Sequence, residues 1–326
     1  MAARKVIVTD YVFESFDTEK EALSAVGAEL EAYQCKSADE LIPYLAGTHV
    51  ILNTYLPGIG KKIFDHAPDL KAVVRYGIGL DTIDVVEATR HGVMVACVPD
   101  YCINEVADHA LALFLALARK INLSDKKVKV GEWSLAYVKP LKSIQQMRAG
   151  IIGFGRIGRA IASRLKPFGA EIVFFDPMIK TDVDDYRHIE LDELLMTSDA
   201  IFAQCPAGKA THHLINRQAV EKMEKKPILI NCARGTIVET DALVWGLENG
   251  RVGGAGLDLL EDESIVKHDH PIKNFDNVVL TPHSAWYSDA ALPCLRRKAI
   301  EEVVRVLRGE KPKSLINPEV LERRPQ

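Results

Sequence analysis

Three glycines with the spacing Gly-x-Gly-x-x-Gly, from Gly153 to Gly158, follow directly on the β-rich run Gly150–Ile152. After a strand, the first such glycine permits a tight turn and the second lets the backbone approach a pyrophosphate. The third lets the next helix pack closely. Apolar residues at helical spacing follow the loop and predict a helix. The free N–H groups at the start of that helix can bind phosphate oxygens. We therefore predict a dinucleotide-binding loop formed by Gly153, Gly155, Arg156, Ile157 and Gly158.

Asp176 ends a second β-rich run, Glu171–Phe175, and lies 18 residues after the last glycine of the loop. A carboxylate at this place can accept hydrogen bonds from the adenosine ribose hydroxyls. It would also repel the 2′-phosphate of NADP. The alternative is an aspartate that only terminates a strand. We expect the ribose-binding role, and hence NAD as the cofactor.

Three later β-rich runs are each followed by a loop with an ionisable residue, namely Arg234, Glu263 and His283. Ligands of an open α/β sheet bind beyond the carboxyl ends of its strands, so these loops can converge on one cleft. Hydride attack on a keto acid builds negative charge on the carbonyl oxygen, which an arginine can stabilise while it binds the carboxylate. A histidine can donate the proton, and a paired carboxylate would orient it. Spacing alone leaves open whether the three residues meet, because a lone histidine is by default a surface residue.

The elements that must position these residues alternate between short β-rich runs and helical patterns, which predicts parallel sheets covered by helices. We expect helices over Asp17–Val26, Ser37–Leu45 and Leu292–Leu307, and another that begins at Asp81. The expected strands are Lys5–Thr9, Val50–Asn53, Ala72–Arg75, Met94–Ala96, Gly150–Gly153, Glu171–Phe175, Ala200–Gln204, Ile228–Asn231, Gly254–Asp258 and Val278–Leu280.

A long helix is expected over Asn104–Lys120, with Asn104 as its N-cap and acidic residues in its first turn. Its leucines and Phe114 leave little polar surface. A helix that is apolar on most sides is usually buried, so we expect it between domains or in a dimer interface.

Composition excludes several classes of protein. The 326 residues are 48% hydrophobic and 26% charged, as in globular proteins, and long enough for two domains. The formal charge of −4 gives no electrostatic reason to expect nucleic acid or an anionic membrane as a partner. No apolar run reaches the roughly 18 residues that span a bilayer, and no secretion signal precedes the first β-rich run. The six cysteines form no Cys-x-x-Cys pair, so we expect no metal, no disulfides and a soluble cytoplasmic protein.

Six segments together resemble the D-isomer-specific 2-hydroxyacid dehydrogenase family over nearly the whole chain. They are Arg75–Asp81, Asn104–Asp108, the glycine loop with Asp176, Asn231–Gly235, Gly254–Asp258 and Thr281–His283. The resemblance implies an α/β fold of two doubly wound parallel-sheet domains. A Rossmann cofactor domain, residues 102–287, would be inserted into a flavodoxin-like substrate domain made of residues 1–101 and 288–326. It implies NAD-dependent interconversion of a 2-keto acid and a D-2-hydroxy acid, in a cleft that closes by hinge motion.

The resemblance also assigns the catalytic roles. It implies Arg234 as the substrate-binding arginine, His283 as the proton donor and Glu263 as its partner acid. We prefer Glu263 to Glu261 because the family's acid lies five residues beyond the aspartate that matches Asp258. The family's proline after that acid is replaced here by a serine.

Further contacts are implied by the same resemblance. Asp258 and the carbonyl of Ala233 would hold the nicotinamide amide, while Cys205 and Pro206 would border the nicotinamide ribose. The substrate carboxylate would lie in a segment made of Arg75, Tyr76, Gly77, Ile78 and Gly79, bound by backbone N–H groups of its last three residues. Family members are usually homodimers joined through the cofactor domains and the long apolar helix.

Two alternatives stay open. The segment from His283 to Ser288 resembles the His-x-Ala-Trp-Tyr-Ser segment of the C-terminal-binding-protein corepressors, which would make the chain a dinucleotide-sensing interaction protein. Formate or phosphite oxidation on the same fold is a third possibility. The resemblance to the corepressor segment also favours Trp286 as a wall of the substrate cleft. The alternative is that Trp286 is an ordinary core residue. The side chain of the 2-keto acid is not identified.

Overall fold

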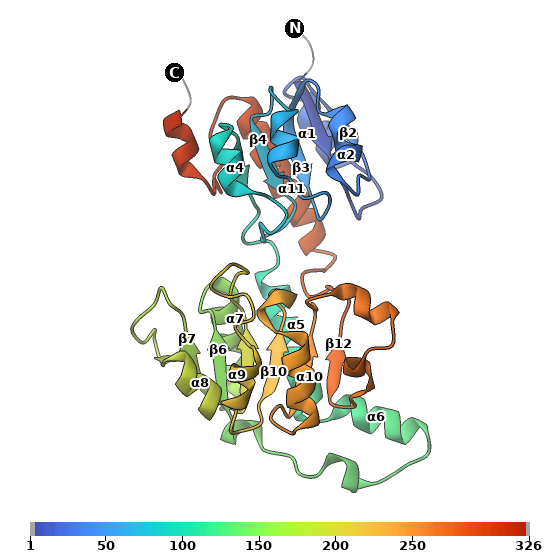
Figure 1. The fold of residues 1–326 in the computed structure, drawn as a ribbon, viewed down its shortest axis with the longest axis vertical. Helices are drawn as coiled ribbons and strands as arrows, with labels where there is room; N and C mark the ends of the chain where they lie inside the picture. The colour runs from blue at the N-terminus through green and yellow to red at the C-terminus, as the bar shows by residue number, and fades with distance from the viewer. Residues whose placement is uncertain (1–3, 324–326) are drawn as a thin grey trace. The chain divides into compact units, whose positions relative to one another are not determined.

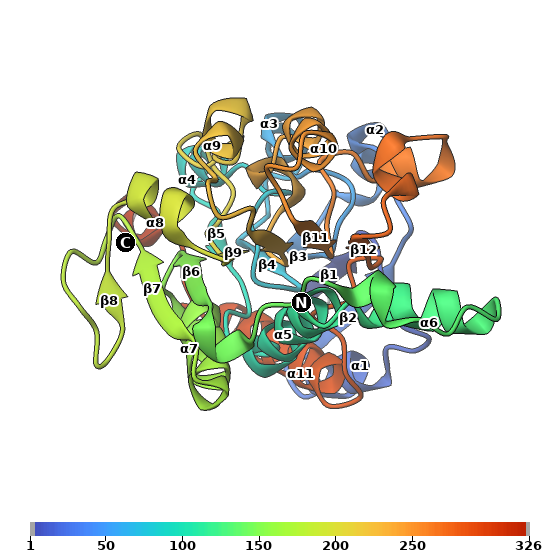
Figure 2. The ribbon, with the colours of Figure 1, turned by 90° about the horizontal axis from the view of Figure 1, so that it is seen from below.

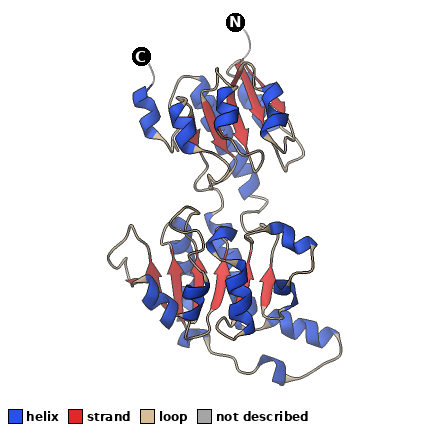
Figure 3. Ribbon diagram, viewed as in Figure 1, coloured by secondary structure: helices blue, strands red, loops and turns tan. Residues whose placement is uncertain are grey.

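The computed structural model describes residues 4–323 and divides the chain into two compact units. One consists of Met1–Tyr101 with Ser288–Gln326, and the other of Cys102–Tyr287. Each contains a parallel sheet with helices on both faces (Figures 1 and 3). Among the described residues, no helix has the length and apolar character needed to cross a membrane.

The first unit is built on a five-stranded parallel sheet in the order β2-β1-β3-β4-β5, the flavodoxin-like order. Successive residues of β3, such as Val50 and Ile51, are fully buried on opposite faces of this sheet. Helices α1 and α11 cover one face, and α2, α3 and α4 cover the other (Figure 2). The elements are β1 (Arg4–Val8), α1 (Asp17–Ser24), β2 (Ala28–Ala32), α2 (Ala38–Leu41), η1 (Ile42–Tyr44), β3 (Thr48–Asn53), α3 (Lys61–Asp65), β4 (Ala72–Arg75), α4 (Val85–Arg90), β5 (Met94–Ala96), α11 (Ala291–Leu307) and η8 (Pro318–Arg323).

The second unit has seven parallel strands in the order β12-β11-β10-β9-β6-β7-β8. Helices α8, α9 and α10 cover one face, and α5 and α7 cover the other (Figure 2). The chain order reverses between β6 and β9, which is the switch point where dinucleotides bind in such sheets. The helices are α5 (Ile103–Ala118), α6 (Ile121–Lys129), α7 (Arg156–Leu165), α8 (Leu191–Thr197), α9 (Arg217–Glu221) and α10 (Thr240–Glu248). The strands are β6 (Arg148–Ile152), β7 (Glu171–Phe175), β8 (Arg187–His188), β9 (Ala200–Ala203), β10 (Ile228–Asn231), β11 (Gly254–Leu257) and β12 (Val278–Leu280). Short 3-10 helices are η2 (Leu135–Val138), η3 (Ile144–Gln146), η4 (Lys166–Phe168), η5 (Gly235–Ile237), η6 (Glu263–Lys267) and η7 (Pro271–Asn274).

The predicted fold class of two doubly wound α/β sheets is confirmed, but some local predictions were wrong. The edge strands β2 and β8 were not predicted, because β2 contains two glutamates, β8 has only two residues, and neither has a continuous apolar run. Helix α4 begins after Asp84, whose carboxylate accepts the Glu87 N–H, and not at Asp81. Helix α5 is preceded by Cys102 instead of being capped by Asn104, whose side chain accepts a hydrogen bond from Arg164.

Candidate active site

The three glycines of the loop meet three different steric demands. Gly153 has φ of +92°, and a Cβ there would lie 2.7 Å from the carbonyl oxygen of Gln204. A Cβ on Gly158 would lie 2.2 Å from the carbonyl oxygen of Gly153, so α7 packs directly against the turn. A Cβ on Gly155 would meet nothing within 4 Å, and helix α7 begins at the next residue, Arg156. The loop therefore leaves open space beside the N–H groups of the helix start, as a bound pyrophosphate requires.

Asp176 is held beside this loop by two backbone groups. Its Oδ2 accepts the N–H of Phe154 at 2.8 Å, and its Oδ1 accepts the N–H of Met178 at 2.9 Å. The Phe154 ring stacks on Phe174 of β7, with ring centroids 3.9 Å apart, which fixes the loop to that strand. The Asp176 side chain is half-buried. A carboxylate in this position has lone pairs left for a sugar hydroxyl.

Cys205 follows β9 and touches the glycine loop, because a Cβ on Gly153 would lie 2.9 Å from its backbone nitrogen. The thiol is buried, and this burial raises the pKa of Cys205 to about 11. At neutral pH it is therefore a neutral packing group and not a nucleophile. Pro206, next along the chain, is exposed.

Arg234 lies in the loop that follows β10. The Asn231 side chain ties this loop together: it donates to the Arg234 carbonyl at 2.9 Å and accepts the Ala233 N–H at 3.1 Å. Nη1 of Arg234 donates to the Ala233 carbonyl at 2.6 Å. Gly235 has no room for a side chain, since a Cβ there would lie 1.9 Å from the Leu260 carbonyl oxygen. The loop that carries Arg234 thus packs on the loop after β11.

His283 and Glu263 face each other across two loops. Nδ1 of His283 lies 3.9 Å from Oε1 of Glu263, an ion-pair separation that is too long for a hydrogen bond. The Glu263 side chain is 65% exposed and that of His283 is 30% exposed. Glu261 instead hydrogen-bonds His213. Although burial raises the pKa of Glu261, the contacts with His213 and the Thr240 N–H outweigh it and lower the pKa overall.

Asp258 organises the turn that bears His283. Its side chain is fully buried and accepts hydrogen bonds from the Thr281 hydroxyl at 2.5 Å and from two backbone N–H groups at 2.9 Å, those of Ser284 and Ala285. The N–H of His283 donates to the Asp258 carbonyl at 2.9 Å, and His283 itself has φ of +53°. The carboxylate therefore holds the turn in shape. Its contact with a nicotinamide amide stays a prediction.

His109 was missed by the sequence analysis. Its Nε2 lies 2.9 Å from Oγ1 of Thr281 and 3.6 Å from Oδ1 of Asp258. Because the Thr281 hydroxyl donates to Asp258, the imidazole must donate to Thr281, which assigns the proton to Nε2. A signal was present, since His109 is the last polar residue of α5 before the apolar run Ala110–Ala118.

The segment Arg75–Gly79 belongs to the first unit. Tyr76 is 2% exposed, and its hydroxyl donates to Glu19 at 3.2 Å within the core, which leaves only its backbone for a role in substrate binding. The Arg75 guanidinium is also buried, bonds the Tyr76 carbonyl and lies 5.2 Å from the centre of the Tyr55 ring. The N–H of Gly77 donates to the Arg75 carbonyl, so Ile78 and Gly79 are the remaining candidates for a carboxylate cradle.

Trp286 is half-buried in the second unit, and its ring makes an edge contact with Tyr287, with centroids 5.7 Å apart. It is not one of the fully buried core side chains. Its role as a cleft wall stays a prediction.

The strand order places these loops in a row along one edge of the sheet. Going from β6 through β9, β10 and β11 to β12, the carboxyl ends carry the glycine loop, Cys205, Arg234, Glu263 and His283. The second unit therefore presents a dinucleotide-type loop next to an arginine and an acid–histidine pair. This set can bind a carboxylate and move a proton.

Comparisons with known proteins agree with this geometry. Residues 111–285 match the model of the family described as "D-isomer specific 2-hydroxyacid dehydrogenase, NAD binding domain". A glyoxylate reductase of Thermofilum pendens is 36% identical over 333 residues, which cover 100% of this chain and 98% of that protein. The crystal structure of D-lactate dehydrogenase from Aquifex aeolicus with NAD and lactic acid matches with a TM-score of 0.85 and 29% identity, over 94% of this chain and 96% of that one. An NADPH-dependent glyoxylate/hydroxypyruvate reductase from Sinorhizobium meliloti, solved with NADP and malonate, matches with a TM-score of 0.86, 26% identity and 100% coverage of both chains.

Proposed function

The chain belongs to the D-isomer-specific 2-hydroxyacid dehydrogenase family, and we propose that it reduces glyoxylate or a similarly small 2-keto acid with NADH. It is an NAD-dependent oxidoreductase that acts on 2-hydroxy and 2-keto acids. Two observations support the small substrate. Two glyoxylate reductases match 100% and 97% of this chain, and the loops of Arg234 and His283 follow β10 and β12, which both pair with β11.

The proposed roles follow from the chemistry of the carbonyl group. The Arg234 guanidinium binds the substrate carboxylate and stabilises the negative charge that grows on the adjacent carbonyl oxygen. Protonated His283 donates a proton to that oxygen, and Glu263 orients the imidazole and favours its charged form. NADH, when bound, supplies the hydride that the carbonyl carbon receives.

The second unit fits that cofactor. We assign the pyrophosphate to the open space at Gly155 and the start of α7, and the adenosine ribose to Asp176. Cys205 and the loop of Ala233 lie on the neighbouring strands, where the nicotinamide end would reach. The first unit, with Ile78 and Gly79, is proposed as the substrate domain.

The interaction-protein alternative has no support from the relatives and solved structures named above, which are dehydrogenases or reductases. The same holds for formate or phosphite oxidation.

A cytoplasmic homodimer is part of the proposal. Helix α6 and the segment after it expose Ile121, Val130, Trp133 and Leu135, which are 56%, 68%, 89% and 66% exposed. A run of large apolar side chains in water is typical of a surface that another chain covers. The six cysteines are thiols in the described part of the chain, which suits a reducing compartment.

Steady-state reduction of glyoxylate, hydroxypyruvate and pyruvate, with NADH or NADPH at equal ionic strength, tests the function. We expect glyoxylate to be turned over, and kcat/KM to be higher with NADH because Asp176 repels a 2′-phosphate. The matched variant Asp176→Ser should narrow the difference between the two cofactors. Equal efficiency of both cofactors in the wild type would contradict the role of Asp176. No turnover of any 2-keto acid would contradict the function.

A further inference from the structure

Two histidines and a glutamate, none of them a member of the proposed catalytic trio, gather in the second unit. His212, His213 and Glu261 each offer one ligand atom, and these atoms all lie within 4.8 Å of one another. Nε2 of His213 is in hydrogen-bond contact with Oε1 of Glu261, and the two imidazole rings are 3.9 Å apart between centroids. His212 and Glu261 are exposed and His213 is half-buried, so the cluster is open to an ion from solution.

The backbone holds the cluster in place. The N–H of His213 donates to the Thr236 carbonyl at 2.8 Å, and the N–H of Thr240 donates to the second carboxylate oxygen of Glu261 at 3.2 Å. His213 has φ of +50°, in the left-handed region. In an extended chain, successive side chains point to opposite sides. Here the turn at His213 brings the two rings to the same side, facing one carboxylate.

The donor set decides which ions fit. Two imidazole nitrogens and one carboxylate oxygen suit borderline divalent ions such as Zn²⁺, Co²⁺, Ni²⁺ and Cu²⁺, with water in the remaining positions. Ca²⁺ and Mg²⁺ need sets of oxygen ligands that this cluster does not offer. The span of 4.8 Å or less is compatible with ligands about 2.0–2.2 Å from a central ion after small side-chain adjustments.

We propose that His212, His213 and Glu261 form a binding site for a divalent transition-metal ion, separate from the proposed cofactor and substrate sites. The cysteine spacing predicts no metal, but it carries no information on this cluster, whose glutamate lies 48 residues from the second histidine. Glu261 lies two residues before Glu263, so an ion at this site would connect the loop of the acid to the loop after β9.

The test is calorimetric titration of untagged protein, stripped with a chelator that is then removed, with Zn²⁺, Co²⁺ and Ni²⁺. We expect one ion per chain, tighter binding of Ni²⁺ than of Co²⁺, and no binding of Mg²⁺. Co²⁺ should also give a visible absorption band. His212→Ala should weaken Zn²⁺ binding by roughly tenfold or more. Metal sites lose about tenfold in affinity even when a residue that only supports a ligand is changed. His66→Ala removes an equally exposed imidazole from the other unit and should leave the affinity unchanged.

His212 is exposed, so its alanine variant should keep the wild-type melting temperature in the absence of metal. That measurement separates loss of a ligand from loss of the fold. The proposal is overturned if the wild type shows no saturable binding of Zn²⁺. It is also overturned if His212→Ala and Glu261→Gln both bind Zn²⁺ as tightly as the wild type does. Neither result depends on 2-keto acid turnover, so the proposed function stands or fails independently.

Discussion

Oε1 of Glu263 lies 3.9 Å from Nδ1 of His283, in a contact that is open to solvent. With His283 as the proposed proton donor, reduction needs the protonated imidazole, so kcat/KM for the 2-keto acid should fall as rising pH removes that proton. Glu263→Gln removes a negative charge that favours the imidazolium. The alkaline fall of the profile should therefore move to lower pH, and only slightly, because the charges of partly exposed side chains are screened. The measurement is the pH profile of kcat/KM in both proteins.

Glu248→Gln makes the same change on an exposed face of α10 and serves as the control. Its profile should match that of the wild type. If Glu263→Gln also keeps the wild-type profile while Glu261→Gln shifts it, the partner of His283 has been wrongly assigned. Glu263 was preferred to Glu261 because of its spacing from Asp258. The hydrogen bond of Glu261 with His213 supports this choice.

At the level of elements, α5 and the loop after β11 are connected to the turn that bears His283 by hydrogen bonds from His109 to Thr281 and from Thr281 to Asp258. Thr281→Val keeps the shape of the side chain but removes the hydroxyl that both the buried Asp258 carboxylate and the His109 imidazole contact. We expect a loss of about 1–3 kcal/mol in the free energy of unfolding. Because the turn carries His283, kcat should also fall, with a smaller effect on KM for the 2-keto acid.

Thr281→Ser keeps the hydroxyl and should restore most of kcat. Chemical denaturation together with steady-state kinetics on the two variants checks the prediction. If Thr281→Val lowers the stability but leaves kcat unchanged, these hydrogen bonds only stabilise the fold and do not position His283.

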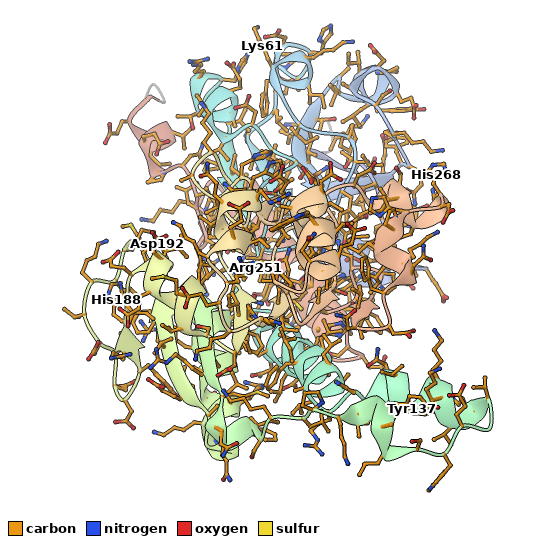
Figure 4. All side chains as sticks on the ribbon, turned by 60° about the horizontal axis from the view of Figure 1, so that its bottom comes forward. Lys61, Tyr137, His188, Asp192, Arg251 and His268 are labelled. Atoms are coloured by element: carbon orange, nitrogen blue, oxygen red, sulfur yellow. The ribbon has the colours of Figure 1, made fainter. Side chains whose placement is uncertain are left out.

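For the whole molecule, the apolar segment from α6 to η2 is the surface that we propose a second copy of the chain covers (Figures 1 and 4; Tyr137 is labelled in Figure 4). We expect sedimentation equilibrium to give about twice the 36.1 kDa of one chain. Trp133→Glu places a charge on the most exposed of these side chains and should shift the mass toward that of one chain, because burying an unpaired charge is costly. Met178→Glu changes a side chain that is 88% exposed elsewhere in the same unit, and should leave the mass unchanged. A wild-type mass of one chain at micromolar concentration would refute the dimer.

Much of the fold could be read from local pattern. β4, β5, β7 and β10 have the predicted bounds because mostly buried parallel strands are continuous apolar runs, which can be recognised without knowing their partners. β8 could not be predicted, since two residues at a sheet edge carry no periodic signal. The N-cap at Asp84 was missed for a related reason, because Asp81 and Asp84 both fit the same rule and only the folded backbone selects one of them.

The sequence by itself predicted the glycine loop and Asp176, because each is a local motif tied to the end of one strand, and it gave the candidate trio through a family resemblance. Only the tertiary structure decided which of these residues touch. The order β12-β11-β10-β9-β6 brings together loops that are far apart along the chain, so Gly235 meets Leu260 and His213 meets Glu261. In the folded chain Asp258 is buried beneath the turn that bears His283, and His109 contacts Thr281 in the loop after β12. The physical reason is that strand order follows from how whole helices and sheets pack, which no short stretch of sequence records.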